Sequence, residues 1–184
     1  MIIETRNTFE SLEEFIAKKD AAAVGDIVLV SEENETEKTP YVVAHITGQG
    51  ECRLVRKNLM SAYRPMKTGT INLLSWLEND FRDGILKNLP EELHERVKTV
   101  TLPSIREVYG CDKFGVRSEG EQFEWFKDPI NRIAIKDDSE YSDWYWLRDV
   151  ASASLFAGVD LGGSCYRGTA SDAWVGVRPA LSIS

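Results

Sequence analysis

The sequence predicts an α+β fold in which short strands at both ends of the chain flank a helical middle. Short apolar segments bounded by turn residues occur over residues 27–57 and again over 141–183, as in antiparallel strands. Between residues 71 and 109 the apolar side chains recur at helical spacing. The 184 residues suffice for one hydrophobic core. No segment reaches the roughly 18 consecutive apolar residues that a membrane span requires.

The first predicted element is a helix over residues 8–19. Thr8 is suited to cap this helix. Its apolar side is formed by Phe9, Leu12, Phe15 and Ile16. A Gly25-Asp26 turn then leads into the first longer strand. We expect residues 1–24 to be an N-terminal helical extension and residues 25–184 to be a single α+β domain.

Three strands should follow the extension and form an antiparallel meander. They are predicted over residues 27–30, 41–47 and 52–57, each ending in a segment rich in turn residues. The first connection, residues 31–38, is acidic. Its carboxylates lack the alternating ligand spacing of a calcium loop, so we expect a solvated turn there.

The helical middle of the chain should contain three helices. The first is predicted over residues 71–82, with Gly84 ending it, and the second begins at Pro90 and runs to Val97. Pro103 opens the third, which runs to Tyr109 after a brief extended segment. Residues 110–129 should be irregular, and their aromatic side chains are expected to fill the core beneath this loop. These side chains are Phe123, Trp125 and Phe126.

The last 48 residues should form short strands and tight turns. Strands are predicted over residues 141–148, 155–159, 165–167 and 174–183, and Pro179 indicates an edge position or a bulge in the last of them. The core side chains expected in this region are Trp144, Trp146, Leu147, Val177 and Leu181.

Charge and composition argue against several function classes. The net charge is −8, from 22 basic and 30 acidic residues, which argues against nucleic-acid binding. Three dispersed cysteines and two histidines offer little material for a zinc site or for histidine-based acid–base catalysis. Neither a phosphate-binding loop nor a dinucleotide-binding glycine pattern is present. We therefore expect no catalytic residues, no metal and no cofactor.

The charged groups near the C-terminal strands have structural interpretations. The segment 137–140, together with Asp143, is the best acidic cluster for calcium, but it lacks the glycine that an EF-hand loop requires. A solvated turn is the favoured interpretation. Arg148 and Arg178 are expected to be half-buried and paired with carboxylates. The partners considered are Asp143, Asp149 and Asp172.

Two C-terminal motifs resemble those of an uncharacterised domain family of bacteria and phages. That family typically reads Trp-Trp-Leu-Arg-Ser, then a variable stretch, then Gly-Val-Arg-Pro-Ala. Here residues 144–148 read Trp-Tyr-Trp-Leu-Arg and residues 176–181 read Gly-Val-Arg-Pro-Ala-Leu. The segment 71–81 is similar to the family's Ser, Leu, Trp-Leu-Asn, Phe order. The resemblance covers residues 25–184, although Asp149 replaces the usual Ser.

The same ending is similar to C-type-lectin-like folds of the formylglycine-generating branch. That branch includes phage receptor-binding proteins and the variable proteins of diversity-generating retroelements. The resemblance implies short antiparallel strands with two to four helices packed on them, and a lectin-like motif region over residues 141–184. It also implies that ligand contacts come from the region before the final strand, here residues 151–174.

Seven side chains of that region are the candidate ligand-binding residues. They are Ser152, Ser154, Phe156, Asp160, Tyr166, Arg167 and Asp172. Tyr and Arg on loops of small residues are common contact residues, whereas Gly, Ser and Ala can also serve only tight turns. On the binding interpretation, Tyr166→Ala or Arg167→Ala should abolish binding and leave the melting temperature nearly unchanged.

The leading functional hypothesis is a non-catalytic module that binds or displays a protein or carbohydrate ligand. A structural component of a phage or bacterial assembly is the alternative, with oligomerisation through residues 1–24 or an exposed surface. A degenerate enzyme-like fold without activity is the third. The N-terminus lacks the pattern of a signal peptide, so a cytoplasmic or phage-particle location is expected.

Overall fold

The fold is a mixed α/β arrangement with two main sheets, described by a computed structural model for residues 6–33 and 37–184. The strands are β1 (Thr8–Phe9), β2 (Ile27–Val30), β3 (Thr39–Ile46), β4 (Cys52–Arg56), β5 (Lys67–Thr68), β6 (Ile71–Asn72), β7 (Val97–Thr101), β8 (Tyr145–Ser152), β9 (Leu155–Val159), β10 (Cys165–Thr169) and β11 (Ala180–Ile183). The α-helices in this part of the chain are α1 (Leu12–Ala17), α2 (Leu73–Trp76), α3 (Arg82–Leu86) and α4 (Ile105–Tyr109). A π-helical segment, η2 (Leu77–Phe81), joins α2 to α3, and the 3-10 helices are η1 (Lys19–Ala21), η3 (Glu91–Arg96), η4 (Glu124–Lys127) and η5 (Pro129–Arg132).

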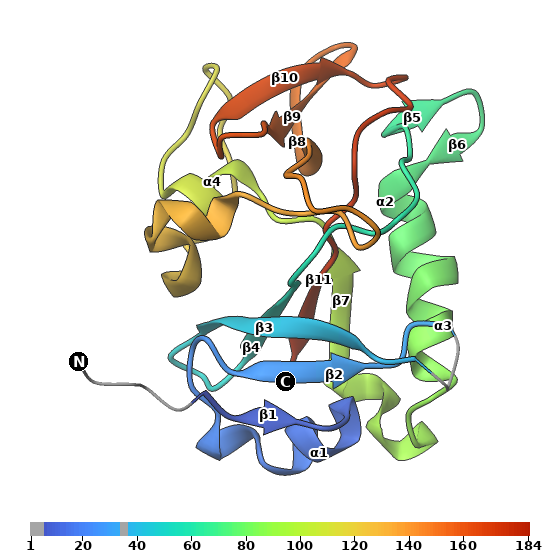
Figure 1. The fold of residues 1–184 in the computed structure, drawn as a ribbon, viewed down its shortest axis with the longest axis vertical. Coiled ribbons are helices and arrows are strands. Elements are labelled where there is room, and N and C mark those ends of the chain that lie inside the picture. The colour runs from blue at the N-terminus through green and yellow to red at the C-terminus, as the bar shows by residue number, and fades with distance from the viewer. Residues whose placement is uncertain (1–5, 34–36) are drawn as a thin grey trace.

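The larger sheet has six strands in the order β1-β2-β3-β4-β11-β7 (Figure 1). The predicted antiparallel meander is confirmed, since β3 pairs antiparallel with both β2 and β4. Strand β11, near the end of the chain, lies between β4 and β7 and pairs with both of them. The predicted strand over residues 174–183 is shorter than expected. Pro179 indicated an edge position or a bulge, and the edge position is wrong because β11 has a neighbour on either side. Pro179 lies just before β11, and an irregularity occurs at Ser182 and Ile183.

The smaller sheet has the order β10-β9-β8, is antiparallel and lies at the opposite end of the molecule (Figure 1). Successive side chains of a strand point to opposite faces, so each face of this sheet meets its own core. Trp146 belongs to the core cluster that also includes the six-stranded sheet and the central helix. Tyr145 and Leu147 belong to a second cluster, which contains Phe123 and Phe126.

Most side chains that the sequence assigned to the core are buried. Phe123 and Phe126 fill the space beneath the irregular segment as predicted, while Trp125 is half-buried. Of the five predicted core residues near the C-terminus, four are buried completely and Trp144 is half-buried.

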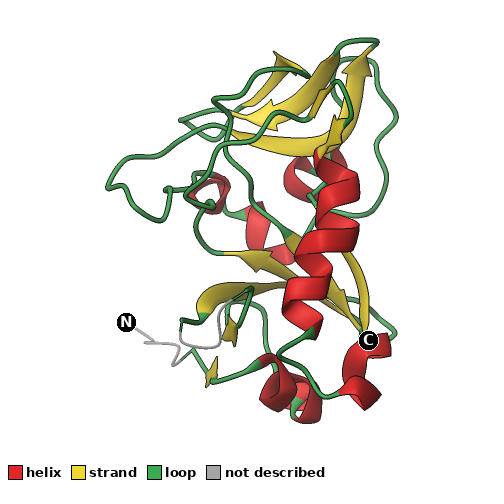
Figure 2. Cartoon of the chain, turned by 90° about the vertical axis from the view of Figure 1, so that its right-hand side faces the viewer, coloured by secondary structure: helices red, strands yellow, loops and turns green. Residues whose placement is uncertain are grey.

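A continuous helical run over residues 73–86 spans the distance between the two sheets (Figure 2). The prediction ended this helix before Gly84, but Gly84 lies inside α3. A Cβ atom at Gly84 would come within 2.5 Å of the carbonyl oxygen of Glu32. Glycine is therefore used here for close helix packing against the residues that follow β2, and this use overrides its tendency to end a helix.

The remaining predicted helices are present with changed boundaries. Ser11 caps α1 in place of Thr8, because residues 8 and 9 pair with β2 as the parallel strand β1. The segment after Pro90 is a 3-10 helix. Helix α4 begins with a capping box between Ser104 and Glu107.

The described part of the N-terminal segment packs on the main sheet. The apolar side predicted for the first helix contributes four buried residues to the larger core cluster, Phe9, Leu12, Phe15 and Ile16. The division of the chain at residue 24 stays a prediction. Within the acidic connection, residues 34–36 lie outside the described residues. Glu32 does not fit the solvated-turn interpretation, because it is nearly buried and bonds to Arg56 at 2.7 Å.

Candidate functional site

The seven predicted ligand-binding residues do not share one face of the small sheet. Register places Tyr166 opposite Gly158, and Phe156 opposite Gly168, on the face that carries Trp146. Arg167 alternates to the opposite face and is exposed. Its guanidinium carbon lies 5.0 Å from the ring centroid of Phe114.

The other four predicted residues lie at turns. Ser152 and Ser154 are exposed at the β8–β9 connection. One carboxylate oxygen of Asp160 accepts the backbone N–H groups of residues 162 and 164, at 2.9 Å each. Asp172 accepts the backbone N–H of Thr169 at 3.1 Å. For the two aspartates these contacts match the turn interpretation considered from the sequence.

Tyr166 is held in an aromatic cluster on the inner face of the small sheet. Its ring centroid lies 4.5 Å from that of Trp144, edge to face, and 6.5 Å from that of Trp146. The hydroxyl oxygen is buried and has no hydrogen-bond partner among the described residues. Burial raises the pKa of Tyr166 well above its ordinary value, so the phenol is protonated.

The two arginines of the C-terminal motifs have partners other than those predicted. Arg148 donates to both carboxylate oxygens of Glu107, at 2.6 and 2.9 Å. Burial acts to lower the pKa of Arg148, but the hydrogen bonds and charge of Glu107 raise it above its ordinary value. The predicted partner Asp149 instead accepts the backbone N–H of Ile105, at 2.6 Å.

Arg178 is buried, with 1% of its surface exposed, rather than half-buried. Its guanidinium donates to the backbone carbonyls of Arg56, Lys57 and Asn131 at 2.9–3.0 Å. No carboxylate of the described residues forms an ion pair with it. The predicted ion pair is therefore wrong at Arg178, and backbone carbonyls take the place of the carboxylate.

The acidic cluster considered for calcium is divided among separate partners. Asp137 bonds to Arg56 at 2.8 Å, and Asp138 lies 3.2 Å from Lys136. Asp143 accepts the hydroxyl of Tyr63 at 2.6 Å. Within residues 6–33 and 37–184, no group of three or more His, Cys, Asp and Glu side chains is arranged to hold a metal ion.

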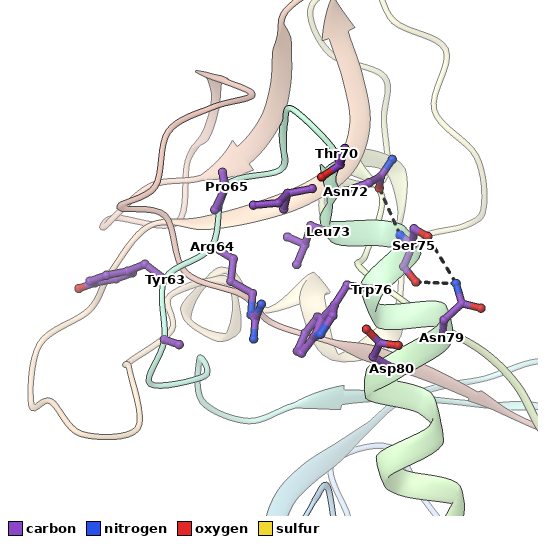
Figure 3. A pocket seen from close by; sticks show the side chains of 12 residues that line it. Tyr63, Arg64, Pro65, Thr70, Asn72, Leu73, Ser75, Trp76, Asn79 and Asp80 are labelled. Atoms are coloured by element: carbon purple, nitrogen blue, oxygen red, sulfur yellow. Dashed lines mark hydrogen bonds between the residues drawn. The ribbon is translucent and has the colours of Figure 1, made fainter.

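A cavity of about 730 Å³ lies beside the helical run (Figure 3). Residues 62–65, the β5–β6 hairpin and the first turns of the run line it. The lining residues are Ala62, Tyr63, Arg64, Pro65, Thr70, Ile71, Asn72, Leu73, Ser75, Trp76, Asn79 and Asp80. None of the seven predicted binding residues is among them.

Local structure fixes the walls of this cavity. The Asn72 side chain caps α2 by accepting the backbone N–H of Ser75 at 3.2 Å. On the facing wall, the indole N–H of Trp146 donates to the carbonyl of Arg64 at 2.9 Å. The lower part of the helical wall is π-helical, a conformation that occurs frequently at functional sites.

Arg64, from the 62–65 segment, and Trp76, from the helical run, lie side by side in the lining of the cavity (Figure 3). The guanidinium carbon of Arg64 lies 3.7 Å from the ring centroid of Trp76, within the range of a cation–π contact. The Nε atom of Arg64 is buried and has no hydrogen-bond partner among the described residues. Arg64 also forms no ion pair with any described carboxylate.

The rim of the cavity combines an aromatic ring, an aliphatic side chain and polar groups. Tyr63 is 39% exposed, and its hydrogen bond to Asp143 raises the pKa of the phenol. Ile71 is 52% exposed, and Asn79 and Asp80 are exposed on the helical wall. The cavity can therefore offer apolar contact together with hydrogen-bond donors and acceptors.

The helix predicted over residues 71–82 contains Trp76, but neither Trp76 nor Arg64 was singled out from the sequence. The signal available in the sequence was that three polar residues, Glu78, Asn79 and Asp80, follow Trp76 and Leu77. A tryptophan at the edge of a helix's apolar side can border a cavity. Arg64 has no such signal, because its stacking on Trp76 depends on the path of the 62–65 loop.

No helix among the described residues is long and apolar enough to cross a membrane. Searches among curated proteins and among solved structures found no match. The expected resemblance to an uncharacterised domain is confirmed in its coarse form, although the matched segment begins later than residue 25. Residues 88–184 match the domain of unknown function DUF6273, and the chain belongs to this family.

Proposed function

We propose that this protein is a non-catalytic binding module, of bacterial or phage origin, whose protein or carbohydrate ligand enters the cavity lined by Arg64 and Trp76. One observation carries the proposal. The guanidinium of Arg64 lies at the cavity wall, and it makes neither a hydrogen bond to a described residue nor an ion pair with a described carboxylate. Its terminal N–H groups can therefore donate to a ligand oxygen in the cavity without giving up a bond within the protein.

The stacking of Arg64 on Trp76 supports the same proposal. The guanidinium plane is held by the indole at 3.7 Å, so little of its conformational freedom remains to be lost when a ligand binds. A guanidinium offers several N–H donors in a fixed arrangement, which suits carboxylate and other planar oxygen groups. The Asp80 carboxylate and the amide oxygen of Asn79, whose amide nitrogen donates to the carbonyl of Ser75 at 2.8 Å, supply further polar groups on the helical wall.

The C-type-lectin-like interpretation of residues 141–184 is part of this proposal. It is supported by the motif Gly176–Leu181, which leads directly into the closing strand β11. It is also supported by the order of the elements, because the antiparallel sheet β8–β9–β10 immediately precedes that closing segment.

The test compares ligand capture by the wild type with capture by two variants. Arg64→Met keeps the length of the side chain but removes its donors. Arg117→Met removes an exposed arginine outside the cavity and serves as the control. Each protein is applied to a glycan array and to immobilised bacterial surface extract. We expect the wild type and Arg117→Met to retain the same ligand and Arg64→Met to lose at least about tenfold in affinity. Equal retention by all three proteins would refute the role of the cavity.

A structural component of an assembly is the second candidate, and exposed apolar side chains favour it. Tyr141 is 79% exposed, Ile130 is 64% exposed and Trp174 is 48% exposed. Large exposed apolar side chains are typical of surfaces that contact other proteins. Light scattering across a range of concentrations tests this candidate, because a strict monomer at every concentration would count against it.

A further inference from the structure

A second cavity, of about 500 Å³, lies on the side of the small sheet opposite the Tyr166 cluster. The end of α4, the tight turn that follows it, η5 and the β9–β10 connection contribute to its walls. The lining residues are Tyr109, Lys113, Phe114, Arg132, Gly163, Ser164 and Cys165. Three of them belong to the segment 151–174, which the sequence predicts to be in contact with a ligand.

Positive charge converges on this cavity. The Nζ atom of Lys113 and the guanidinium carbon of Arg132 each lie 5.1 Å from the ring centroid of Tyr109, and Arg167 stacks on Phe114, which lines the cavity. None of these three cations forms an ion pair with a described carboxylate. In a protein of net charge −8, three unneutralised cations around one cavity require an explanation.

The acidic side chains near the cavity have hydrogen-bond or ion-pair partners of their own. The carboxylates of Asp160 and Asp149 keep their charge, but they accept backbone N–H groups, Asp160 from the turn that supplies Gly163 and Ser164, and Asp149 from Ile105. Asp112 pairs with Arg106 at 2.8 Å. Two further groups that could become anionic are neutral. Burial raises the pKa of the Cys165 thiol to about 12. The hydroxyl group of Tyr109 donates a hydrogen bond to the carbonyl oxygen of Gly163 at 2.8 Å.

Phe114 gives a second and independent indication. Among the described residues it is the only one other than glycine with a positive φ, at 58°, and Gly115 follows at 69°. A β-carbon makes this left-handed conformation unfavourable, so the turn holds Phe114 there at a steric cost. Strained residues of this kind cluster at ligand sites. Here the strain places a 38% exposed aromatic ring at the cavity wall, where Arg167 stacks on it.

We propose that this cavity is an anion-binding site for a phosphate-type oxyanion, held by Lys113, Arg132 and Arg167. The Nε atom of Arg132 is occupied by the carbonyl of Phe126 at 3.0 Å, which orients the side chain. Its terminal nitrogens have no partner among the described residues other than the face of Tyr109. The exposed hydroxyl of Ser164 can add a neutral donor. This site is separate from the cavity at Arg64.

The experiment is a calorimetric titration with inorganic phosphate, repeated with phenyl phosphate, at constant ionic strength. The variants Lys113→Gln and Arg167→Gln each remove one cation that makes no hydrogen bond to a described residue. Lys98→Gln makes the same change in net charge on the exposed surface of β7 and is the control. We expect saturable binding of one phosphate, about tenfold weaker in each cavity variant and unchanged in the control.

The possible outcomes distinguish a specific anion site from a general effect of charge. The proposal is overturned if the wild type binds neither probe saturably. It is also overturned if Lys98→Gln loses as much phosphate affinity as the cavity variants, because the loss would then reflect only the net charge of the protein. Tighter binding of phenyl phosphate than of inorganic phosphate supports a phosphate ester with a ring beside Phe114, whereas equal binding supports the free anion. Arg64→Met should bind phosphate like the wild type, so the two sites can fail independently.

Discussion

The surroundings of Arg178 and of Arg64 form two contrasting regions of this molecule, although both arginines lie against aromatic rings. Arg178 is buried, and three backbone carbonyls accept its N–H groups. Arg64 is half-buried at a cavity wall, and its Nε atom has no partner among the described residues. Aromatic contact therefore does not distinguish a structural arginine from one available to a ligand. The two sites differ in how many guanidinium donors the protein itself uses.

The difference follows from where each side chain enters the fold. Arg178 reaches between the end of β4 and η5, and so connects the main sheet to the segment that lies over the second core. Its charge is buried with hydrogen bonds to neutral carbonyls, an arrangement that is costly unless every donor is used. Arg64 belongs to a loop whose backbone is anchored by Trp146 and Val175, so the loop does not depend on the guanidinium.

The largest effect on stability is expected at Arg178, whose N–H groups donate to backbone carbonyls. Arg178→Met should lower the free energy of unfolding by about 4 kcal/mol, because three buried carbonyls lose their donor. Urea unfolding followed by tryptophan fluorescence measures this loss, with Arg117→Met as the control for an exposed arginine. A loss below about 1 kcal/mol would mean that the carbonyls find other partners, and the contrast with Arg64 would then disappear.

An intermediate effect is expected at Tyr166, whose hydroxyl shares with Arg64 the lack of a partner. Tyr166→Ala should cost about 2–3 kcal/mol, since the ring packs between Trp144 and Trp146. The sequence predicts a nearly unchanged melting temperature for both Tyr166→Ala and Arg167→Ala. With the structure, we expect it only for Arg167→Ala. Tyr166→Phe should instead raise the free energy of unfolding by about 1 kcal/mol, because it removes a buried unpaired hydroxyl. A destabilised Tyr166→Phe would show that the hydroxyl has a partner in solution.

Local sequence patterns predicted many of the elements of this fold. The alternation of apolar segments and turn residues located β2, β3, β4 and β9, and helical periodicity located the run that contains Trp76. The errors occurred where distant parts of the chain meet. Gly84 continues a helix because the backbone at Glu32 lies against it, and β11 is a central strand because β4 and β7 lie on either side.

The candidate site was less predictable than the fold. The lectin-like resemblance favoured the segment 151–174, which is rich in Gly, Ala and Ser and contains Tyr166 and Arg167, and part of that segment lines the second cavity. The larger cavity joins a loop, a short hairpin and a helix wall, and its key contact links residues twelve positions apart in sequence, Arg64 and Trp76. No periodicity in a single sequence records such a contact, because it depends on how the loop is anchored.

The smallest effect, and the one that completes the comparison, is expected at Arg64. Arg64→Met loses a cation–π contact worth about 0.5–1 kcal/mol but also removes a buried donor without a partner, so the two changes offset each other. We expect its free energy of unfolding to lie within about 0.5 kcal/mol of the wild type in the urea titration used for Arg178→Met. A loss above about 2 kcal/mol would place Arg64 among the structural arginines of this protein. The cavity would then lose the free donor that distinguishes it as a binding site.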